Sequence, residues 1–234
     1  MAKKITSYIP NTITCMNLVC GAVAVINAFK GNHHMLGGLT GFEWCYIFIG
    51  IAAVCDFFDG AAARALKAYS ALGKELDSLS DLVSFGIAPG MLIYNTMMVY
   101  GTSDILPYLA LYIPVAGELR LAAFNLDDRQ TTSFLGMPIP ANAIFWIGMS
   151  AAIHKWGYPG DWMMAVVIVV IASLMLVTRM KMFSLKFKNF SLSDNLLRYT
   201  IIVATILFVA LEGVAGFAWT ILFYIALSFV PAKP

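Results

Sequence analysis

The chain has 234 residues, of which 60% are hydrophobic and 12% are charged, and its mean hydropathy is +0.80. This composition lies far outside that of soluble globular domains, so lipid is the expected solvent of the fold. The formal net charge of +2 argues against a nucleic-acid partner, because binding to a phosphate backbone needs a concentrated basic face.

Apolar segments follow one another along the chain, each long enough to cross a bilayer core of about 30 Å at about 1.5 Å per residue. We predict eight transmembrane helices, at 11–29, 44–66, 81–101, 105–123, 138–154, 161–178, 196–212 and 214–230. The last two form one apolar run interrupted by Glu212, Gly213 and Gly216, which indicates a tight helical hairpin. The sequence therefore predicts an all-α integral membrane protein with a single domain over residues 1–234.

The basic residues predict how these helices are oriented, because Lys and Arg collect on the cytoplasmic side of membrane proteins. With the N-terminus inside, Lys30 and Lys155 are the two outer basic residues of the fifteen. The other thirteen lie inside: Lys3, Lys4, Arg64, Lys67, Lys74, Arg120, Arg129, Arg179, Lys181, Lys186, Lys188, Arg198 and Lys233. We therefore expect a protein of the cell (inner) membrane with both termini in the cytoplasm.

Four aspartates stand where the predicted second and third helices approach the cytoplasm. Asp56 lies within the second span, where an unpaired carboxylate is costly, and Asp59 follows three residues later. Asp77 and Asp81 are four residues apart at the start of the third span. Helical spacings of three and four place the members of each pair on one face. The short link at 67–76 makes the two helices antiparallel neighbours, so the two pairs can face each other.

Four carboxylates in a poorly hydrated pocket repel one another unless they are protonated or a cation neutralises them. Ligands that are all oxygen favour hard ions, namely Mg²⁺, Mn²⁺ or Ca²⁺, and two ions are compatible with four aspartates. In the alternative interpretation, the carboxylates pair with Arg64, Lys67 and Lys74 at the membrane interface.

Small residues accompany the aspartates. Gly60 and Ala63 lie four and seven residues after Asp56, on the same helical face, where the absence of bulk lets a ligand approach the backbone. Gly73 can do the same at the turn, and the planar guanidinium of Arg64 can hold phosphate oxygens. A divalent-cation transporter would explain acids in a membrane but not this spacing. A noncatalytic membrane scaffold, the other alternative, predicts that Asp81→Asn leaves function intact.

Together these positions resemble the signature of the CDP-alcohol phosphatidyltransferase family: D-x-x-D-G-x-x-A-R, eight residues, G-x-x-x-D-x-x-x-D. The resemblance implies a core of six transmembrane helices, with the 196–230 hairpin added here, a homodimer, and an active site that opens to the cytoplasm. It implies that Mg²⁺ or Mn²⁺ is bound by Asp56, Asp59 and Asp77. Asp81 would complete the metal site and act as the general base. The pocket for the CDP-linked lipid would be shaped by Gly60, Ala63, Arg64 and Gly73.

Further stretches resemble the branch of this family that transfers the phosphatidyl group of CDP-diacylglycerol to L-serine. They are 81–86, 119–125, 134–140, and 10–14 with Asn17. The branch usually carries a second basic residue where this chain has Ala123. Arg120 is a candidate partner for the carboxylate of an amino-acid acceptor, and Asn125 can add a hydrogen bond. Arg120 as a positive-inside anchor, and glycerol 3-phosphate or inositol phosphate as the acceptor, are the alternatives.

Asn11, Thr14 and Asn17 form a polar stripe on the first predicted helix. Hydrogen bonds between helices and contact with a substrate are equally good explanations of such a stripe.

Overall fold

The computed structural model describes residues 8–126, 134–176, 181–182, 191 and 195–229. Seven of the basic residues predicted to lie inside are outside these ranges: Lys3, Lys4, Arg129, Arg179, Lys186, Lys188 and Lys233.

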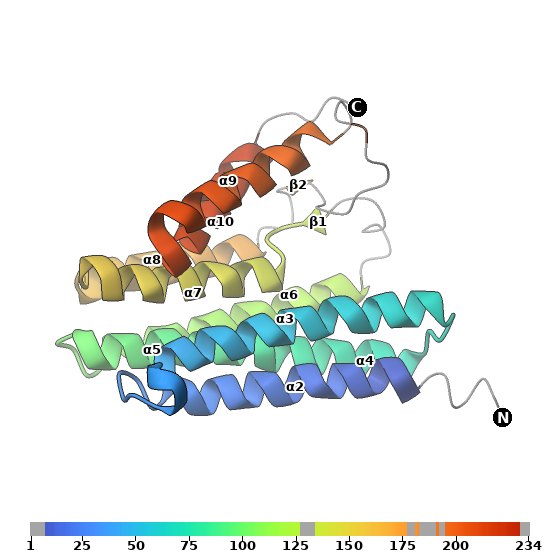
Figure 1. Cartoon of the computed structure of the whole chain (residues 1–234), viewed down its shortest axis with the longest axis horizontal. Coiled ribbons are helices and arrows are strands. Elements are labelled where there is room, and N and C mark those ends of the chain that lie inside the picture. The colour runs from blue at the N-terminus through green and yellow to red at the C-terminus, as the bar shows by residue number, and fades with distance from the viewer. Residues whose placement is uncertain (1–7, 127–133, 177–180, 183–190, 192–194, 230–234) are drawn as a thin grey trace.

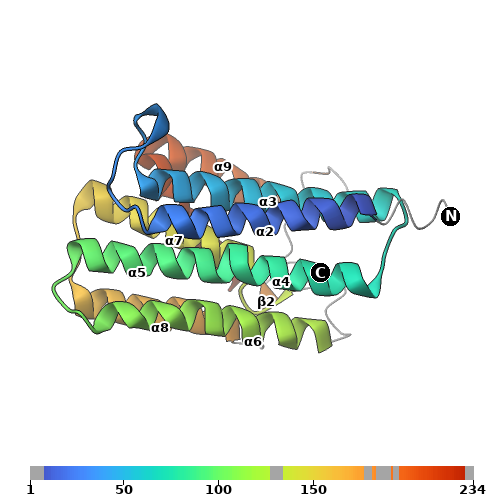
Figure 2. The ribbon, with the colours of Figure 1, turned by 90° about the horizontal axis from the view of Figure 1, so that it is seen from below.

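The described chain is almost entirely helical; the helices of its first part run roughly parallel to the long axis of the molecule, and the two C-terminal helices are inclined to them (Figures 1 and 2). In chain order the long helices are α2 (Tyr8–Ala28), α3 (Gly41–Ala65), α4 (Ala71–Asp81), α5 (Ala88–Tyr100), α6 (Tyr112–Leu126), α7 (Ile139–Trp156), α8 (Asp161–Leu176), α9 (Leu196–Glu212) and α10 (Gly216–Ser228). Short helical turns lie between them: η1 (Leu36–Gly38), η2 (Leu82–Ile87), η3 (Leu106–Leu111) and η4 (Gly213–Ala215). Two antiparallel strands of two residues complete the description, β1 (Phe134–Leu135) and β2 (Lys181–Met182).

Several of these elements are long and apolar enough to cross a membrane, which confirms the predicted all-α membrane fold. In the described part of the chain they are Tyr8–Ala28, Gly41–Ala65, Ala71–Tyr100, Leu106–Leu126 and Leu196–Ser228. The last stretch contains both α9 and α10, while α8 is apolar but shorter. The predicted number of eight spans stays a prediction.

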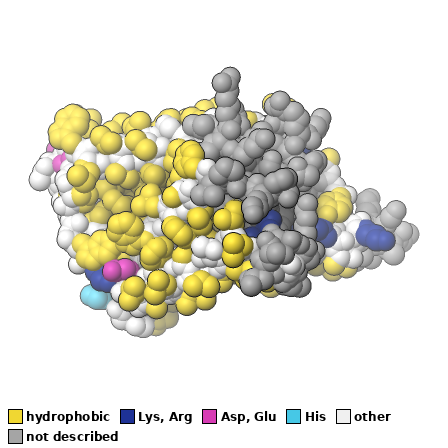
Figure 3. All heavy atoms as spheres, turned by 90° about the horizontal axis from the view of Figure 1, so that it is seen from above, with side chains coloured by type: hydrophobic (Ala, Val, Ile, Leu, Met, Phe, Trp, Pro, Cys, Tyr) yellow, Lys and Arg dark blue, Asp and Glu magenta, His cyan; other side chains and the backbone are white. Residues whose placement is uncertain are grey.

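The surface fits a lipid environment. On the face where α9 and α10 lie uppermost, hydrophobic side chains cover much of the described surface, and the few visible charged side chains lie toward its two ends (Figure 3). Val203, Ile206 and Leu211 of α9 are each more than 60% exposed. Apolar side chains in such numbers belong against lipid tails rather than water.

The third predicted span begins earlier than the sequence indicated. Residues 67–76 were expected to be a link, but α4 begins at Ala71 because Ser70 caps it, its Oγ accepting the Gly73 N–H at 2.9 Å. The first turns of α4 are polar, so hydropathy gives no sign of them. Asp77 and Asp81 consequently lie inside a helix that continues through the π-helix η2 into α5, rather than at the start of a span.

The C-terminal hairpin has the predicted form. Gly213 adopts φ +65°, a conformation that glycine reaches without strain, and the chain reverses between α9 and α10. Glu212 accepts an ion-pairing hydrogen bond from Lys155 at 2.6 Å, which ties this turn to the end of α7.

Close helix packing brings α2 against the segment that follows Asp81. A Cβ added to Gly21 would lie 2.7 Å from Ser84 Cα, a distance that real side chains do not reach. Ser84 Oγ donates to the main-chain oxygen of Asn17 at 2.9 Å. Glycine at this position therefore sets how near α2 can come to η2.

Candidate active site

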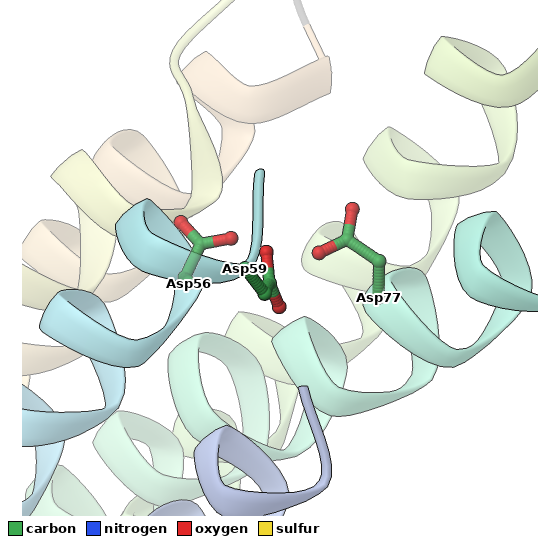
Figure 4. Close-up of side chains that lie close together, drawn as sticks. All are labelled: Asp56, Asp59 and Asp77. Atoms are coloured by element: carbon green, nitrogen blue, oxygen red, sulfur yellow. The ribbon is translucent and has the colours of Figure 1, made fainter. Parts of the chain in front are cut away.

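Three of the four aspartates of the motif meet between α3 and α4. Carboxylate oxygens of Asp56, Asp59 and Asp77 all lie within 4.8 Å of one another. Figure 4 shows Asp56 and Asp59 on α3 and Asp77 on α4, gathered around the space between the two helices. Asp59 is buried, and Thr14 Oγ1 of α2 donates to its Oδ2 at 2.7 Å.

Asp81 lies one turn farther along α4 than Asp77 and is not one of these three. Its side chain is buried, and its Oδ1 accepts a hydrogen bond from Asn17 Nδ2 at 3.1 Å. The carboxylate is thus held by α2 beside the cluster, at the point where α4 passes into the π-helix η2. Such π-helical turns are frequent at functional sites.

The three clustered aspartates fit a hard divalent cation. Mg²⁺ and Ca²⁺ bind oxygen at about 2.0–2.6 Å, so two oxygens on opposite sides of one ion lie about 4–5 Å apart. The upper limit of 4.8 Å within the cluster is compatible with oxygens that share one ion. Because like charges repel strongly where water is scarce, a cation between the helices would also relieve the repulsion among the carboxylates.

Two cavities meet at the aspartates. The smaller, of about 230 Å³, lies among α2, α3 and α4; its lining includes the polar side chains of Asn11, Thr14 and Lys74 together with Ala63 and Gly73. The larger, of about 1130 Å³, reaches up α7, α9 and α10; its lining includes Asp56, Ile144, Ile201, Thr205 and Ile221. Both are lined by Asp59, Gly60 and Asp77, which therefore form the wall that the two cavities share.

The residues predicted to hold the CDP-linked lipid divide between these cavities. Gly60, Ala63 and Gly73 line the smaller one, and Arg64 lines the larger one. A Cβ on Gly73 would lie 3.1 Å from Asn11 Oδ1, so a side chain there would narrow the smaller cavity.

The two residues predicted to bind the acceptor line neither cavity. Arg120 of α6 is 4% exposed, and its Nε and Nη1 have no hydrogen-bond partner among the described residues. Its guanidinium lies 5.5 Å from the centre of the Phe124 ring. A buried cation with unused donors is costly, which is the condition expected of a group that awaits an anion.

Asn125 has a structural contact instead. Its Nδ2 donates to Ser78 Oγ at 2.8 Å, and its main-chain oxygen accepts from Lys74 Nζ at 3.1 Å. Both hydrogen bonds connect the end of α6 to α4, so the side chain of Asn125 makes a contact between helices.

Some residues of the site were not assigned from the sequence. Thr14 and Asn17, for which two explanations stayed open, contact Asp59 and Asp81 directly. Arg198 and Tyr224, on the C-terminal hairpin, line the larger cavity with Asp56. They stand far from the motif in sequence, and the one available signal was a charged residue, Arg198, at the start of an apolar run.

Comparisons with known proteins agree with this site. A model of the CDP-alcohol phosphatidyltransferase family matches residues 7–179. A CDP-diacylglycerol–serine O-phosphatidyltransferase of Bacillus subtilis is 40% identical over 152 residues, which is 65% of this chain and 77% of the relative. A protein of the same name from Mycobacterium leprae is 32% identical over 184 residues, 74% of this chain but 57% of the relative. An archaetidylserine synthase of Methanothermobacter thermautotrophicus is 29% identical over 178 residues, 74% of this chain and 70% of the relative.

Proposed function

The chain belongs to the CDP-alcohol phosphatidyltransferase family, and from this premise we propose that it transfers the phosphatidyl group of CDP-diacylglycerol to the hydroxyl of L-serine. The products are phosphatidylserine and CMP. The observation that carries the proposal is the cluster of Asp56, Asp59 and Asp77 at the place where the two cavities meet. The names of the relatives from Bacillus subtilis and Mycobacterium leprae support serine as the acceptor.

The aspartates would hold two divalent cations, either Mg²⁺ or Mn²⁺, and Asp81 would complete the metal site. Ca²⁺ is the less favoured ion. Bound there, the cations would neutralise the diphosphate and improve CMP as a leaving group. The protein's part is to supply oxygen ligands from two helices in fixed positions, since Asp56 and Asp59 are one turn apart on α3.

The two cavities suggest how the donor lipid is seated. The smaller cavity among α2, α3 and α4 suits the cytidine and its ribose, because Asn11, Thr14 and Lys74 offer polar groups. Gly60, Ala63 and Gly73 leave room for the nucleotide. The larger cavity has an apolar lining suited to acyl chains. The diphosphate would then lie at the shared wall, where Arg64 can bind its oxygens in a bidentate manner.

Asp81 would serve as the general base for the acceptor. The acceptor hydroxyl attacks the phosphorus that bears the lipid, the bond from that phosphorus to the CMP oxygen breaks, and the hydroxyl proton passes to Asp81. The buried guanidinium of Arg120 is the proposed partner for the carboxylate of serine, because its Nε and Nη1 await an acceptor. Asn125 would act by tying α6 to α4.

We further propose a homodimer in the inner membrane with both termini and the active site on the cytoplasmic side. The basic residues Arg64, Lys67 and Lys74 lie near the aspartates at one end of α3 and α4, while Lys30 and Lys155 lie at the opposite end of the bundle. The distribution fits the preference of basic residues for the cytoplasmic side.

The test is an acceptor panel. The purified protein is given CDP-diacylglycerol and Mn²⁺ with L-serine, glycerol 3-phosphate, inositol phosphate or no acceptor, and CMP release is measured. We expect release with serine, and none when a chelator removes the metal. Release with another alcohol alone would replace serine as the acceptor, and metal flux into sealed vesicles without CMP release would favour a transporter.

A further inference from the structure

Asn17 of α2 contacts the proposed base from outside the family motif. The residue is fully buried, and its Nδ2 donates to Asp81 Oδ1 at 3.1 Å. An ionised carboxylate can only accept hydrogen bonds, so the amide nitrogen of Asn17 faces Asp81 and the amide oxygen lies on the other side of the same carbon. That oxygen, Oδ1, has no hydrogen-bond partner among the described residues.

The position of Asn17 is fixed by its neighbours. Its main-chain oxygen accepts from Ser84 Oγ at 2.9 Å, and Gly21, one turn later on α2, allows the two segments to come this close. Ser84 belongs to η2, the π-helical turn that directly follows Asp81. Asn17 and Asp81 are therefore held against each other by both their side chains and their helices.

An unused acceptor beside a base matches one class of substrate. In a vicinal amino alcohol, the hydroxyl and the ammonium group stand on adjacent carbons. When the hydroxyl meets Asp81, the ammonium group lies beside it, and a neutral amide oxygen is a suitable acceptor for its N–H. The substrate would then offset the free-energy cost of burying the amide oxygen of Asn17 without a hydrogen-bond partner.

We propose that Asn17 is a positioning and specificity residue: its Nδ2 holds one oxygen of Asp81 so that the other faces the acceptor hydroxyl, and its Oδ1 binds the ammonium group of a vicinal amino alcohol. The inference rests on the proposed function, since it assumes that Asp81 serves an acceptor hydroxyl.

The chain offers a matched control in Asn27. It stands on the same helix, is 5% exposed, and also has a buried Oδ1 without a partner among the described residues. Its Nδ2, however, donates to the main-chain oxygen of Val23 and not to an aspartate. Asn17→Leu and Asn27→Leu therefore remove the same groups from the same helix, at about 15 Å from each other at helical rise.

The experiment compares the acceptor L-serine with a competing ligand, 3-hydroxypropionate, which lacks only the ammonium group. The full-length wild type and both variants are purified, and the KM of L-serine is measured together with the inhibition constant of 3-hydroxypropionate against serine transfer. For Asn17→Leu we expect kcat to fall about 10- to 100-fold, the KM of serine to rise about 10-fold, and the inhibition constant of 3-hydroxypropionate to stay unchanged. For Asn27→Leu all three constants should match the wild type.

Two results would overturn the inference. One is an equal weakening of serine and 3-hydroxypropionate by Asn17→Leu, and the other is kinetics like those of Asn27→Leu. If Asn17→Leu does not fold, as judged by its elution as a single species in detergent, Asn17→Ser removes the amide with less bulk and carries the same comparison. A wild type that releases no CMP with serine would overturn the proposed function as well, so the two failures are distinguishable.

Discussion

Aspartates so close in sequence differ in what surrounds them. Asp56, Asp59 and Asp77 turn toward one another, whereas Asp81 is buried against Asn17 of another helix. The helical spacing alone puts Asp77 and Asp81 on one face and cannot separate their roles. The surroundings of the carboxylates differ because of α2, where Thr14 donates a hydrogen bond to Asp59 and Asn17 donates one to Asp81.

Asp81→Asn is predicted to abolish most of the turnover while the protein still folds. A side-chain amide is not a base, and general base catalysis typically contributes about 100- to 10 000-fold. CMP release by the purified variant gives the rate, and its thermal unfolding in detergent reports on the fold. Asp104→Asn, which changes an exposed aspartate in the loop after α5, is the control and should retain wild-type activity. Equal rates for the two variants would exclude Asp81 as the base.

Arg120→Leu is predicted to raise the KM of serine by about 10- to 100-fold, since a hydrogen bond to a charged group contributes about 1.5–3 kcal/mol. The KM of CDP-diacylglycerol should not change. Steady-state kinetics with each substrate varied in turn makes the measurement. Arg120→Lys keeps the charge but loses the planar guanidinium, so its KM of serine should lie between those of the wild type and Arg120→Leu. A rise in the KM of the donor instead would assign Arg120 to the phosphates.

At the scale of elements, the sequence predicts apolar helices well and polar helix starts poorly. The hairpin at 196–212 and 214–230 appears as expected, because Gly213 interrupts a continuous apolar run. The beginning of α4 was placed ten residues too late, since its first turns are polar and its start is marked by the Ser70 cap. Hydropathy gives no sign of the π-helix η2, which packs against α2 and α6.

Gly21→Val is predicted to destabilise the protein by about 1–3 kcal/mol, the usual cost of overpacking a close contact. The new side chain would collide with Ser84 and push α2 away from η2. Gly50→Val is the matched control on α3, where an added Cβ would have no neighbour within 4 Å. Thermal unfolding in detergent should show a lower transition for Gly21→Val alone. An unchanged transition temperature would mean that α2 can move away from η2 without a loss of stability.

At the scale of the whole molecule, the family resemblance drawn from the signature is confirmed by the family model over residues 7–179. The match ends before α9 and α10, so the motif gave no reason to connect the hairpin with the aspartates. The structure places both helices along the larger cavity. A contact between segments so distant in sequence depends on how the whole bundle packs, which no local pattern encodes.

Thr205→Trp is predicted to slow the transfer from long-chain CDP-diacylglycerol more than from a short-chain analogue, because indole would occupy the part of the larger cavity lined by α9. The ratio of the two rates is the measurement. Val203→Trp, which adds the same side chain at a position that is 64% exposed on the same helix, should leave the ratio unchanged. Equal slowing of both donors by Thr205→Trp would show that acyl chains lie elsewhere.

The wall formed by Asp59, Gly60 and Asp77 between the two cavities has a consequence for kinetics. If nucleotide and acyl chains occupy opposite sides of it, the reaction releases one product to water and keeps the other in the bilayer. The enzyme then encounters its donor by lateral diffusion, and saturation depends on the mole fraction of that lipid in the membrane. Diluting the donor with inert detergent should slow the enzyme even at constant bulk concentration.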